Sequence, residues 1–363
     1  MKVLAVFGTR PEAIKMCPLV KELHNCEKIE LITCLTGQHD EMVQQVLEIF
    51  NISVNYNLKI MKENQTLTLM TIHILEKFDE ILEKEKPGII LVHGDTTSAM
   101  ACAMAGFYRK IPIGHVEAGL RTYNTYSPYP EEFNRQMIDI ISKFYFAPTK
   151  ESADNLLNEG KNKNDIYITG NTVIDALKTT VNLEYKSPYA EWIGDSKLLL
   201  LTMHRRENIG KPMQDVFRAV KRIISKCHNV KVIYPVHLNP NVREIAYKEL
   251  GEEKNILLIE PVNPLEFHNL INISYLVLTD SGGIQEEAPA LGKPVLVLRN
   301  TTERMEGVLS GTLKLIGTDT DNVYSEILKL IEDKNEYKNM SNSKNPYGDG
   351  KASKRILDIL LNV

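Results

Sequence analysis

The sequence predicts two α/β domains, each a doubly wound parallel sheet of Rossmann type with helices on both faces. Its 363 residues favour two domains over one. Short apolar runs alternate with helical stretches along the chain, which is typical of a parallel sheet. The runs are continuous and do not alternate with polar residues, which indicates strands buried on both faces.

Two series of apolar runs indicate two sheets. The first series occupies residues 4–8, 31–37, 89–95, 111–119, 143–149 and 166–171. The second occupies residues 198–204, 230–237, 256–262, 275–283, 294–299 and 313–317. A polar stretch separates the two series, so each half of the chain should build its own sheet.

Helical periodicity between the runs completes the predicted organisation. In residues 67–82, for example, apolar side chains recur at steps of three and four. The first domain is predicted over residues 1–170 and the second over residues 171–350. The last segment, residues 351–363, reads as a helix that could pack on either half.

Composition and charge exclude several classes of protein. The net charge of −4 offers no positive field for nucleic acid or an anionic membrane. The five cysteines form no CxxC pair, which fits a reducing cytosol and argues against disulfides or a thiolate zinc site. The apolar N-terminal run suits a strand better than a signal peptide, and no run is long enough to span a bilayer. We expect a cytoplasmic protein without membrane or nucleic-acid partners.

Polar residues gather where the predicted strands end. Ligands of open parallel sheets bind beyond the carboxyl ends of the strands. The polar strand ends are Gly8–Pro11, His93–Thr96, Glu117–Arg121, His204–Asn208 and Asp280–Gly283. They predict a catalytic site in a cleft between the two halves.

Several residues suit an anionic ligand. Ser281, Gly282 and Gly283 form a turn before a helix, where backbone N–H groups can approach a diphosphate. An ordinary capped turn between a strand and a helix would have the same sequence pattern. Glu287 follows within that helix and could accept ribose hydroxyls or simply complement the helix dipole. Three cations could contact phosphate or be solvated charges: Arg10, Lys15 and Arg304. No GxGxxG or Walker loop, paired acids or zinc-type histidine spacing is present, so we expect no cofactor and no metal.

Three acids suggest proton transfer. Asp95 could instead cap the next helix, and Glu131 could be an ordinary first-turn acid, but Glu117 has no helix start to explain it. Carboxylates that converge on one cleft suit general acid–base chemistry. His204 and His237 end strands of the second half and could polarise or protonate a departing phosphate.

The ordered motifs resemble the non-hydrolysing UDP-N-acetylglucosamine 2-epimerases. The matching segments are residues 7–16, 36–39, 93–99, 114–122, 130–135, 170–177, 204–208, 279–289, 292–299 and 301–307. This resemblance implies a fold similar to GT-B glycosyltransferases, with residues 351–363 returning to the first domain. It also implies a homodimer that supplies N-acetylmannosamine units for a bacterial surface polysaccharide.

The resemblance implies reversible epimerisation of UDP-N-acetylglucosamine to UDP-N-acetylmannosamine at carbon 2. UDP would leave, a 2-acetamidoglucal and UDP would stay bound, and UDP would add again. The diphosphate would contact Arg10, Ser281, Gly282 and Gly283; Glu287 would hold the ribose; Arg304, Phe267 and Val262 would contact the nucleotide. The residues implied around the sugar are Lys15, Asp95, Glu117, Glu131 and His204. Which carboxylate serves which face of carbon 2 stays open.

Some members of this family bind a second UDP-N-acetylglucosamine as an activator. Residues that resemble that site are Gln38, His39, Gln65, Glu131, Arg205 and His237. Glu41 and Asn64 depart from the pattern by adding an anion and removing a cation, which should weaken the site. Three alternatives remain: a hydrolysing epimerase, a GT-B glycosyltransferase that uses a UDP-sugar, and a non-enzymatic sugar-nucleotide sensor, which would not need the three acids together.

Overall fold

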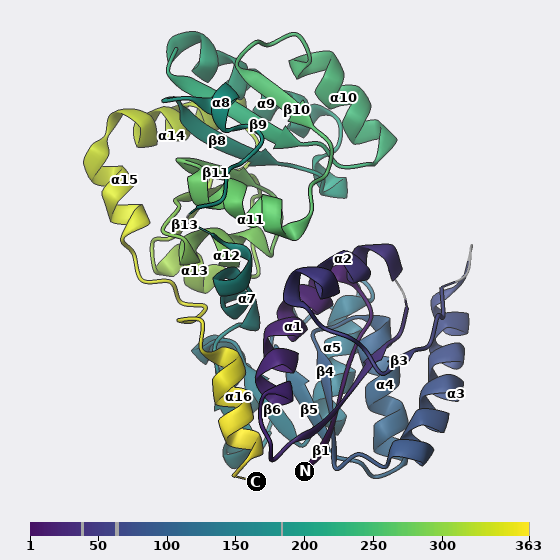
Figure 1. Ribbon diagram of the computed structural model, residues 1–363. Coiled ribbons are helices and arrows are strands. Elements are labelled where there is room, and N and C mark those ends of the chain that lie inside the picture. The colour runs from purple at the N-terminus through teal and green to yellow at the C-terminus, as the bar shows by residue number, and fades with distance from the viewer. Residues whose placement is uncertain (38–39, 62–64, 183, 363) are drawn as a thin grey trace. The chain divides into compact units, whose positions relative to one another are not determined.

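The computed structural model describes residues 1–37, 40–61, 65–182 and 184–362, and they form two compact units. Unit 1 comprises Met1–Thr179 and Tyr347–Val363, and unit 2 comprises Thr180–Pro346. Each unit is built around one parallel sheet (Figure 1). The domain boundary at residues 170 and 171 and the cleft between the halves stay predictions.

The sheet of unit 1 has seven strands within the described ranges, in the order β3-β2-β1-β4-β5-β6-β7, all parallel. The strands are β1 (Lys2–Phe7), β2 (Glu30–Leu35), β3 (Tyr56–Asn57), β4 (Ile89–His93), β5 (Ile113–Val116), β6 (Phe144–Ala147) and β7 (Ile166–Ile168). Six of them coincide with the predicted apolar runs. Strand β3 was not predicted because two residues make no recognisable run.

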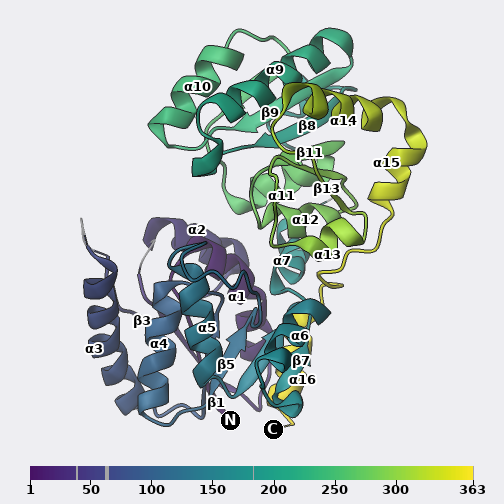
Figure 2. The same ribbon diagram turned by 180° about the vertical axis from the view of Figure 1, so that it is seen from behind.

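Helices cover both faces of this sheet. The helices are α1 (Arg10–His24), α2 (Asp40–Phe50), α3 (Leu67–Glu85), α4 (Thr97–Tyr108), α5 (Glu131–Ile141), α6 (Lys150–Asn158), the 3₁₀ turn η1 (Lys163–Asp165), α7 (Thr172–Thr180) and α16 (Ala352–Leu360). Val3 and Ala5 pack with α1, α2 and α16, while Leu4 and Val6 pack with α3, α4 and α5. Figures 1 and 2 show α16 against unit 1, and its Ile356 is fully buried there. The alternating contacts explain why these strands read as continuous apolar runs.

Unit 2 repeats the plan with six strands among its described residues, in the order β10-β9-β8-β11-β12-β13, again all parallel. They are β8 (Lys197–Thr202), β9 (Val230–Pro235), β10 (Ile256–Ile259), β11 (Leu276–Thr279), β12 (Val295–Val297) and β13 (Leu313–Leu315). Its helical segments are α8 (Ala190–Ile193), η2 (Arg206–Asn208), α9 (Lys211–Lys226), α10 (Pro240–Leu250), α11 (Pro264–Ile273), α12 (Ile284–Ala290), α13 (Met305–Leu309), α14 (Thr320–Glu332) and α15 (Lys334–Ser341).

Both strand orders place a topological switch point beside the first strand. β1 lies between β2 and β4, and β8 lies between β9 and β11, so neighbouring connections leave in opposite directions. Open α/β sheets bind ligands beyond the carboxyl ends of the strands at such a point. The fold class expected from the sequence, two doubly wound parallel sheets, is confirmed. No helix in the described ranges is both long and apolar enough to cross a membrane.

Candidate active site

The switch point of unit 1 is organised by the buried side chain of Glu12. Thr9 and Glu12 form a capping box that starts helix α1, and Glu12 Oε2 accepts the N–H groups of Gly8 and Thr9 at 2.9 and 2.7 Å. Its Oε1 accepts the Thr96 hydroxyl at 2.6 Å, although burial raises the pKa of this carboxyl. Glu12 thereby joins the ends of β1 and β4 and places Arg10 as the first residue of α1.

Glu117 follows β5 and is held by two donors. Its carboxylate forms an ion pair with Lys15 and accepts the Asn171 side-chain N–H at 2.7 Å. The Lys15 and Glu117 side chains are only 11% and 8% exposed, so little water screens the pair. Glu117 also has a φ of 67°, a left-handed conformation that is strained for a residue with a side chain. This strain at a strand end favours a functional role over a packing role.

His93 is a neutral neighbour of the Glu117 carboxylate. Its Nε2 lies 3.7 Å from Glu117 Oε2, and neither ring nitrogen has a hydrogen-bond partner in the described part of the chain. Burial, opposed by Glu117 and reinforced by the nearby Lys15, lowers the pKa of His93 to about 3. The ring is therefore uncharged at neutral pH, with one donor and one acceptor to offer.

Asp95 is paired with a cation and does not cap a helix. Thr96 is the N-cap of α4 and accepts the Ala99 N–H at 3.0 Å, so the capping alternative for Asp95 is wrong. The Asp95 carboxylate forms an ion pair with buried Arg135 of α5. Glu131 is the first residue of α5 and lies one turn before Arg135, on the same face of the helix. Arg135 is thus shared by the carboxylates of Asp95 and Glu132, the latter at 3.2 Å.

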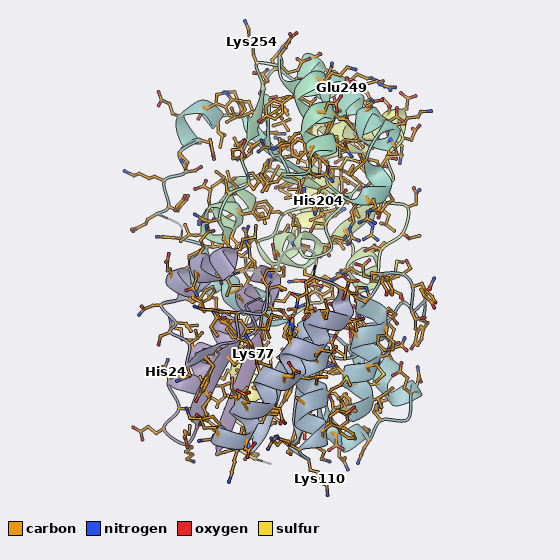
Figure 3. The ribbon with its side chains drawn as sticks, turned by 90° about the vertical axis from the view of Figure 1, so that its right-hand side faces the viewer. His24, Lys77, Lys110, His204, Glu249 and Lys254 are labelled. Carbon is orange, nitrogen blue, oxygen red and sulfur yellow. The ribbon has the colours of Figure 1, made fainter. Side chains whose placement is uncertain are left out.

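Asp280 organises the switch point of unit 2. This fully buried carboxylate accepts the backbone N–H groups of His204 and Arg205 at 3.0 and 2.8 Å and the Asn208 side chain at 3.0 Å. Burial lowers the pKa of His204, although Asp280 opposes the shift. The His204 ring stacks on His237, with ring centres 5.1 Å apart. Figure 3 shows His204 and Lys254, which precedes β10, at opposite ends of unit 2, as expected for the two edges of its sheet.

The Ser281 turn follows β11 and lies against the side chains of Arg304 and Glu287. The Ser281 N–H donates to Thr279 Oγ1 at 3.0 Å, and the Ser281 carbonyl accepts the Gln285 side chain at 3.1 Å. A Cβ built on Gly282 would lie 3.0 Å from the Arg304 guanidinium, and one on Gly283 would lie 3.5 Å from Glu287 Oε1. The glycines therefore allow these two side chains to approach the backbone of the turn.

Three arginines share two carboxylates beside this turn. Arg304 pairs with Glu286 at 3.0 Å and with Glu303. Arg299 and Arg205 lie 3.1 and 3.9 Å from Glu303. Burial would raise the pKa of Glu303, but the three arginines lower it to about 2. Three guanidinium groups beside one turn offer hydrogen-bond donors that suit an anionic ligand.

The residues predicted to contact the ribose and the base also lie in unit 2. Glu287 Oε2 is 3.5 Å from Nε2 of buried His268, whose Nδ1 bonds Thr180 Oγ1 at 2.7 Å. Val262 and Phe267 are half-buried against the apolar cluster under α11 and α12. These contacts orient Glu287 and keep both apolar side chains partly accessible.

The residues predicted for an activator site are described only in part. Gln38, His39 and Asn64, and the side chain of Glu41, lie outside the described residues. Gln65 contacts His73 Nδ1 at 2.9 Å, Arg205 belongs to the arginine cluster, and His237 stacks on His204. Across the described ranges no group of three His, Cys, Asp or Glu side chains is arranged to hold a metal ion.

Some site residues were not predicted from the sequence. They are Glu12, His93, Arg135, Asn171, His268, Asp280 and Glu303. The T-x-x-E spacing of a capping box was a readable signal for Glu12. Asp280 and His93 lay within polar strand ends, but nothing local indicated their roles. Arg135, Asn171 and His268 act on partners that are distant in the sequence and left no local signal. Glu303 pairs with Arg299 and Arg304, which are close in the sequence, but their spacing did not indicate a site.

Comparison with known proteins agrees with this geometry. A family model described as UDP-N-acetylglucosamine 2-epimerase matches residues 21–361. The Bacillus subtilis UDP-N-acetylglucosamine 2-epimerase is 54% identical over 361 residues, which cover 99% of this chain and 95% of that protein. The family and the enzyme class expected from the motifs are confirmed.

Solved structures of similar proteins give the same assignment. The Neisseria meningitidis UDP-GlcNAc 2-epimerase bound to UDP-GlcNAc superposes with a TM-score of 0.94 at 48% identity, and each chain is covered completely. The Methanocaldococcus jannaschii UDP-GlcNAc 2-epimerase in complex with UDP-GlcNAc and UDP has a TM-score of 0.84 at 34% identity, again with complete coverage. The chain therefore belongs to the UDP-N-acetylglucosamine 2-epimerase family.

Proposed function

We propose that this enzyme converts UDP-N-acetylglucosamine reversibly to UDP-N-acetylmannosamine by eliminating UDP to a bound 2-acetamidoglucal and adding it back. The C2 proton is not adjacent to a carbonyl, so direct removal is very difficult. Cleavage of the C1–O bond first creates oxocarbenium character at C1, which acidifies the C2 proton. Epimerisation then needs a base on one face of C2, an acid on the other, and retention of UDP until it adds again.

The Glu117 carboxylate carries this proposal. Lys15 and Asn171 fix both its charge and its orientation, and the left-handed backbone aims it from the strand end. An ionised, immobile carboxylate with little surrounding water suits proton removal and stabilises positive charge at C1. Neutral His93 beside it can form a hydrogen bond with a polar group of the sugar without adding charge.

Asp95 and Glu131 supply the remaining proton-handling groups. Arg135 holds Asp95 as an anion, which favours a role in stabilising charge. No side-chain hydrogen bond or ion pair of Glu131 occurs among the described residues, so its carboxyl is free to exchange a proton with a substrate. We assign Glu117 to one face of C2 and Glu131 to the other, with Asp95 as electrostatic support.

The UDP moiety fits the residues at the switch point of unit 2. The guanidinium groups of the arginine cluster and the Ser281, Gly282 and Gly283 turn suit the diphosphate, with Arg10 of unit 1 as a further contact. Glu287 would accept the ribose hydroxyls, and Val262 and Phe267 would contact the uracil. Neutral His204 can take up a proton as negative charge develops on the leaving UDP.

Isotope exchange at C2 tests the proposal directly. The enzyme is incubated with UDP-N-acetylglucosamine in heavy water, without added NAD or metal, and C2 is followed by NMR. We expect deuterium at C2 of both epimers. An inert C2 proton would overturn the mechanism, and net release of free N-acetylmannosamine and UDP would replace it with hydrolysis. Transfer of the sugar to an added acceptor would indicate a glycosyltransferase.

The family resemblance also implies an oligomeric state, a cellular compartment and a use for the product, which we include in the proposal. We expect a homodimer in a reducing cytosol, where the five cysteines, all free in the structure, are stable. The product would supply N-acetylmannosamine units to a surface polysaccharide. Sedimentation of the purified chain tests the dimer. Substrate saturation curves with and without added UDP-N-acetylglucosamine test activation in the UDP-N-acetylmannosamine direction, which Glu41 and Asn64 should weaken.

A further inference from the structure

We propose that His115 is a positioning residue, a buried imidazole that fixes the two backbone segments carrying Asp95 and Glu117. The inference rests on the proposed function for the roles of these two carboxylates. His115 itself is completely buried on β5 and has no path to a ligand, so it acts through its neighbours.

Both ring nitrogens of His115 have oxygen partners at short distance. Nδ1 lies 2.6 Å from Asp139 Oδ1 of α5, and Nε2 lies 2.7 Å from the carbonyl oxygen of Gly94. A carbonyl oxygen only accepts hydrogen bonds, so Nε2 carries a proton and donates it.

Asp139 connects the His115 ring to the segment that carries Glu117. The second oxygen of Asp139 accepts the Gly119 N–H at 3.2 Å and lies 2.7 Å from Arg121 Nη2. Burial alone would raise the pKa of Asp139, but His115 and Arg121 reverse the effect and lower it. The Nδ1 contact therefore holds one oxygen of a carboxylate whose other oxygen holds the Gly119 backbone.

The two links of His115 end beside the candidate carboxylates. Gly94 directly precedes Asp95 and has a φ of 64°, while Gly119 follows Glu117 and has a φ of 85°. A side chain on Gly119 is impossible, since its Cβ would lie 2.2 Å from the Ser152 carbonyl oxygen. The left-handed Glu117 turn is therefore held in place from several sides, and the Asp139 carboxylate that His115 orients is one of these restraints.

The cost of this arrangement argues for a functional reason. Burying the charges of Asp139 and Arg121 together with the polar ring of His115 removes them from water, and apolar residues of similar size often serve stability equally well. What apolar residues cannot do is hold the Gly94 carbonyl and the Asp139 carboxylate at fixed positions on either side of one rigid ring. Misplacing a reacting group by about 1 Å costs on the order of 100-fold in rate.

Two conservative variants separate the two links. Glutamine places its amide N–H near the position of Nε2, so His115→Gln keeps the link to Gly94 and loses the link to Asp139. Asparagine places its amide near Nδ1, so His115→Asn keeps the opposite link. We expect kcat to fall about 10- to 100-fold in both, with KM and the Kd of UDP within about threefold of wild type.

The control is Tyr145→Phe, a buried residue in contact with the same helix. Its hydroxyl donates to the carbonyls of Asp139 and Ser142 at 3.0 and 2.9 Å but does not touch the Asp139 carboxylate. We expect its kcat to stay close to that of wild type. This contrast separates the positioning of the carboxylates from general support of α5.

A kcat within about twofold of wild type in both histidine variants would overturn the positioning role. Parallel loss of kcat, UDP binding and thermal stability would also overturn it, because a merely structural role predicts that pattern. Nitrogen-15 NMR of the wild-type ring gives an independent test that does not depend on variants folding. We expect a proton on Nε2, the donor to the Gly94 carbonyl, and an unprotonated Nε2 would overturn this link. A wild-type enzyme that exchanges no deuterium at C2 would refute the proposed function instead and leave the ring measurement intact.

Discussion

The switch points of the two units share one topology but arrange their charged side chains differently. In unit 1, the carboxylates Asp95 and Glu117 are each fixed by a single cation, Arg135 or Lys15. In unit 2, three arginines compete for the carboxylates of Glu286 and Glu303. One edge thus presents oriented oxygen acceptors, and the other presents clustered guanidinium groups and glycine backbone.

This difference indicates how one fold, used twice, can divide the work of an enzyme. Oriented carboxylates suit proton transfer and stabilisation of positive charge on a sugar. Cations and exposed N–H groups suit a diphosphate. The division predicts that substitutions in unit 1 change kcat, whereas substitutions in unit 2 change the affinity for UDP.

The largest expected effect is that of Glu117→Gln. The amide keeps the shape but removes the negative charge and the proton acceptor, so kcat should fall by about 1,000-fold, equivalent to about 4 kcal/mol. UDP affinity should stay within a few-fold. Steady-state kinetics and calorimetric titration with UDP check both values.

Glu85→Gln is the matched control for this change. Glu85 is an ion-paired glutamate of unit 1, 3.1 Å from Lys2 at the opposite end of β1. Its loss should leave both kcat and UDP affinity unchanged. A collapse of UDP affinity in Glu117→Gln would break the comparison, because Glu117 would then be a binding residue.

Arg304→Gln should show the reverse pattern in unit 2. Removing this cation leaves Glu286 and Glu303 less compensated beside the Ser281 turn, so an anion is both less attracted and more repelled. UDP affinity should fall roughly 30-fold, or about 2 kcal/mol, and KM should rise accordingly while kcat changes little. Titration with UDP and initial rates measure the two effects.

Arg222→Gln provides the comparison within the same unit. Arg222 pairs with the exposed carboxylate of Asp321 at 2.6 Å, and exposed pairs contribute little to stability. It should bind UDP like the wild type. If Arg304→Gln lowered kcat and spared UDP affinity, the assignment of the nucleotide to unit 2 would be wrong.

The two sheets could be predicted from the sequence because strands buried on both faces contain continuous apolar runs. The sequence also identified the polar strand ends, since the topology of a parallel sheet brings them to one edge. The sequence could not predict the side chains that pair with the carboxylates of Glu117 and Asp95 and fix them. Asn171 lies 54 residues from Glu117, and Arg135 lies 40 residues from Asp95, so only the folded chain brings them together. The charge of His93 likewise depends on its burial, which no motif encodes.

Because buried His93 is uncharged, we expect an effect of pH on stability that is confined to unit 1. Burial lowers the pKa of His93 from its ordinary value of 6.5 to about 3. Below pH 6.5 the unfolded chain binds this proton and the folded chain does not, so stability falls as the pH falls toward 3. By about pH 5 the loss is on the order of 2 kcal/mol. His93→Gln has no such group and should lose less stability on acidification.

Two probes distinguish the units in this experiment. Amide hydrogen exchange of β4, measured by mass spectrometry, reports on unit 1. Fluorescence of Trp192, the single tryptophan of the chain, reports on unit 2 during denaturant unfolding. The pH sensitivity should differ between wild type and His93→Gln in the first probe and agree in the second. Equal sensitivity in β4 would mean that the folded state protonates His93 readily.

The smallest effect is expected for Glu287→Gln, which tests the ribose contact. His268 orients this carboxylate at 3.5 Å, and an amide in its place keeps one acceptor but loses the charge. UDP affinity should fall about fivefold, or about 1 kcal/mol. The wild type should prefer UDP to its 2′,3′-dideoxy analogue, and the variant should lose most of that preference. Glu326→Gln, which removes the partner of Lys314 in the same unit, should retain it. An undiminished preference in Glu287→Gln would place the ribose elsewhere and leave the diphosphate contacts as the main determinant of UDP binding.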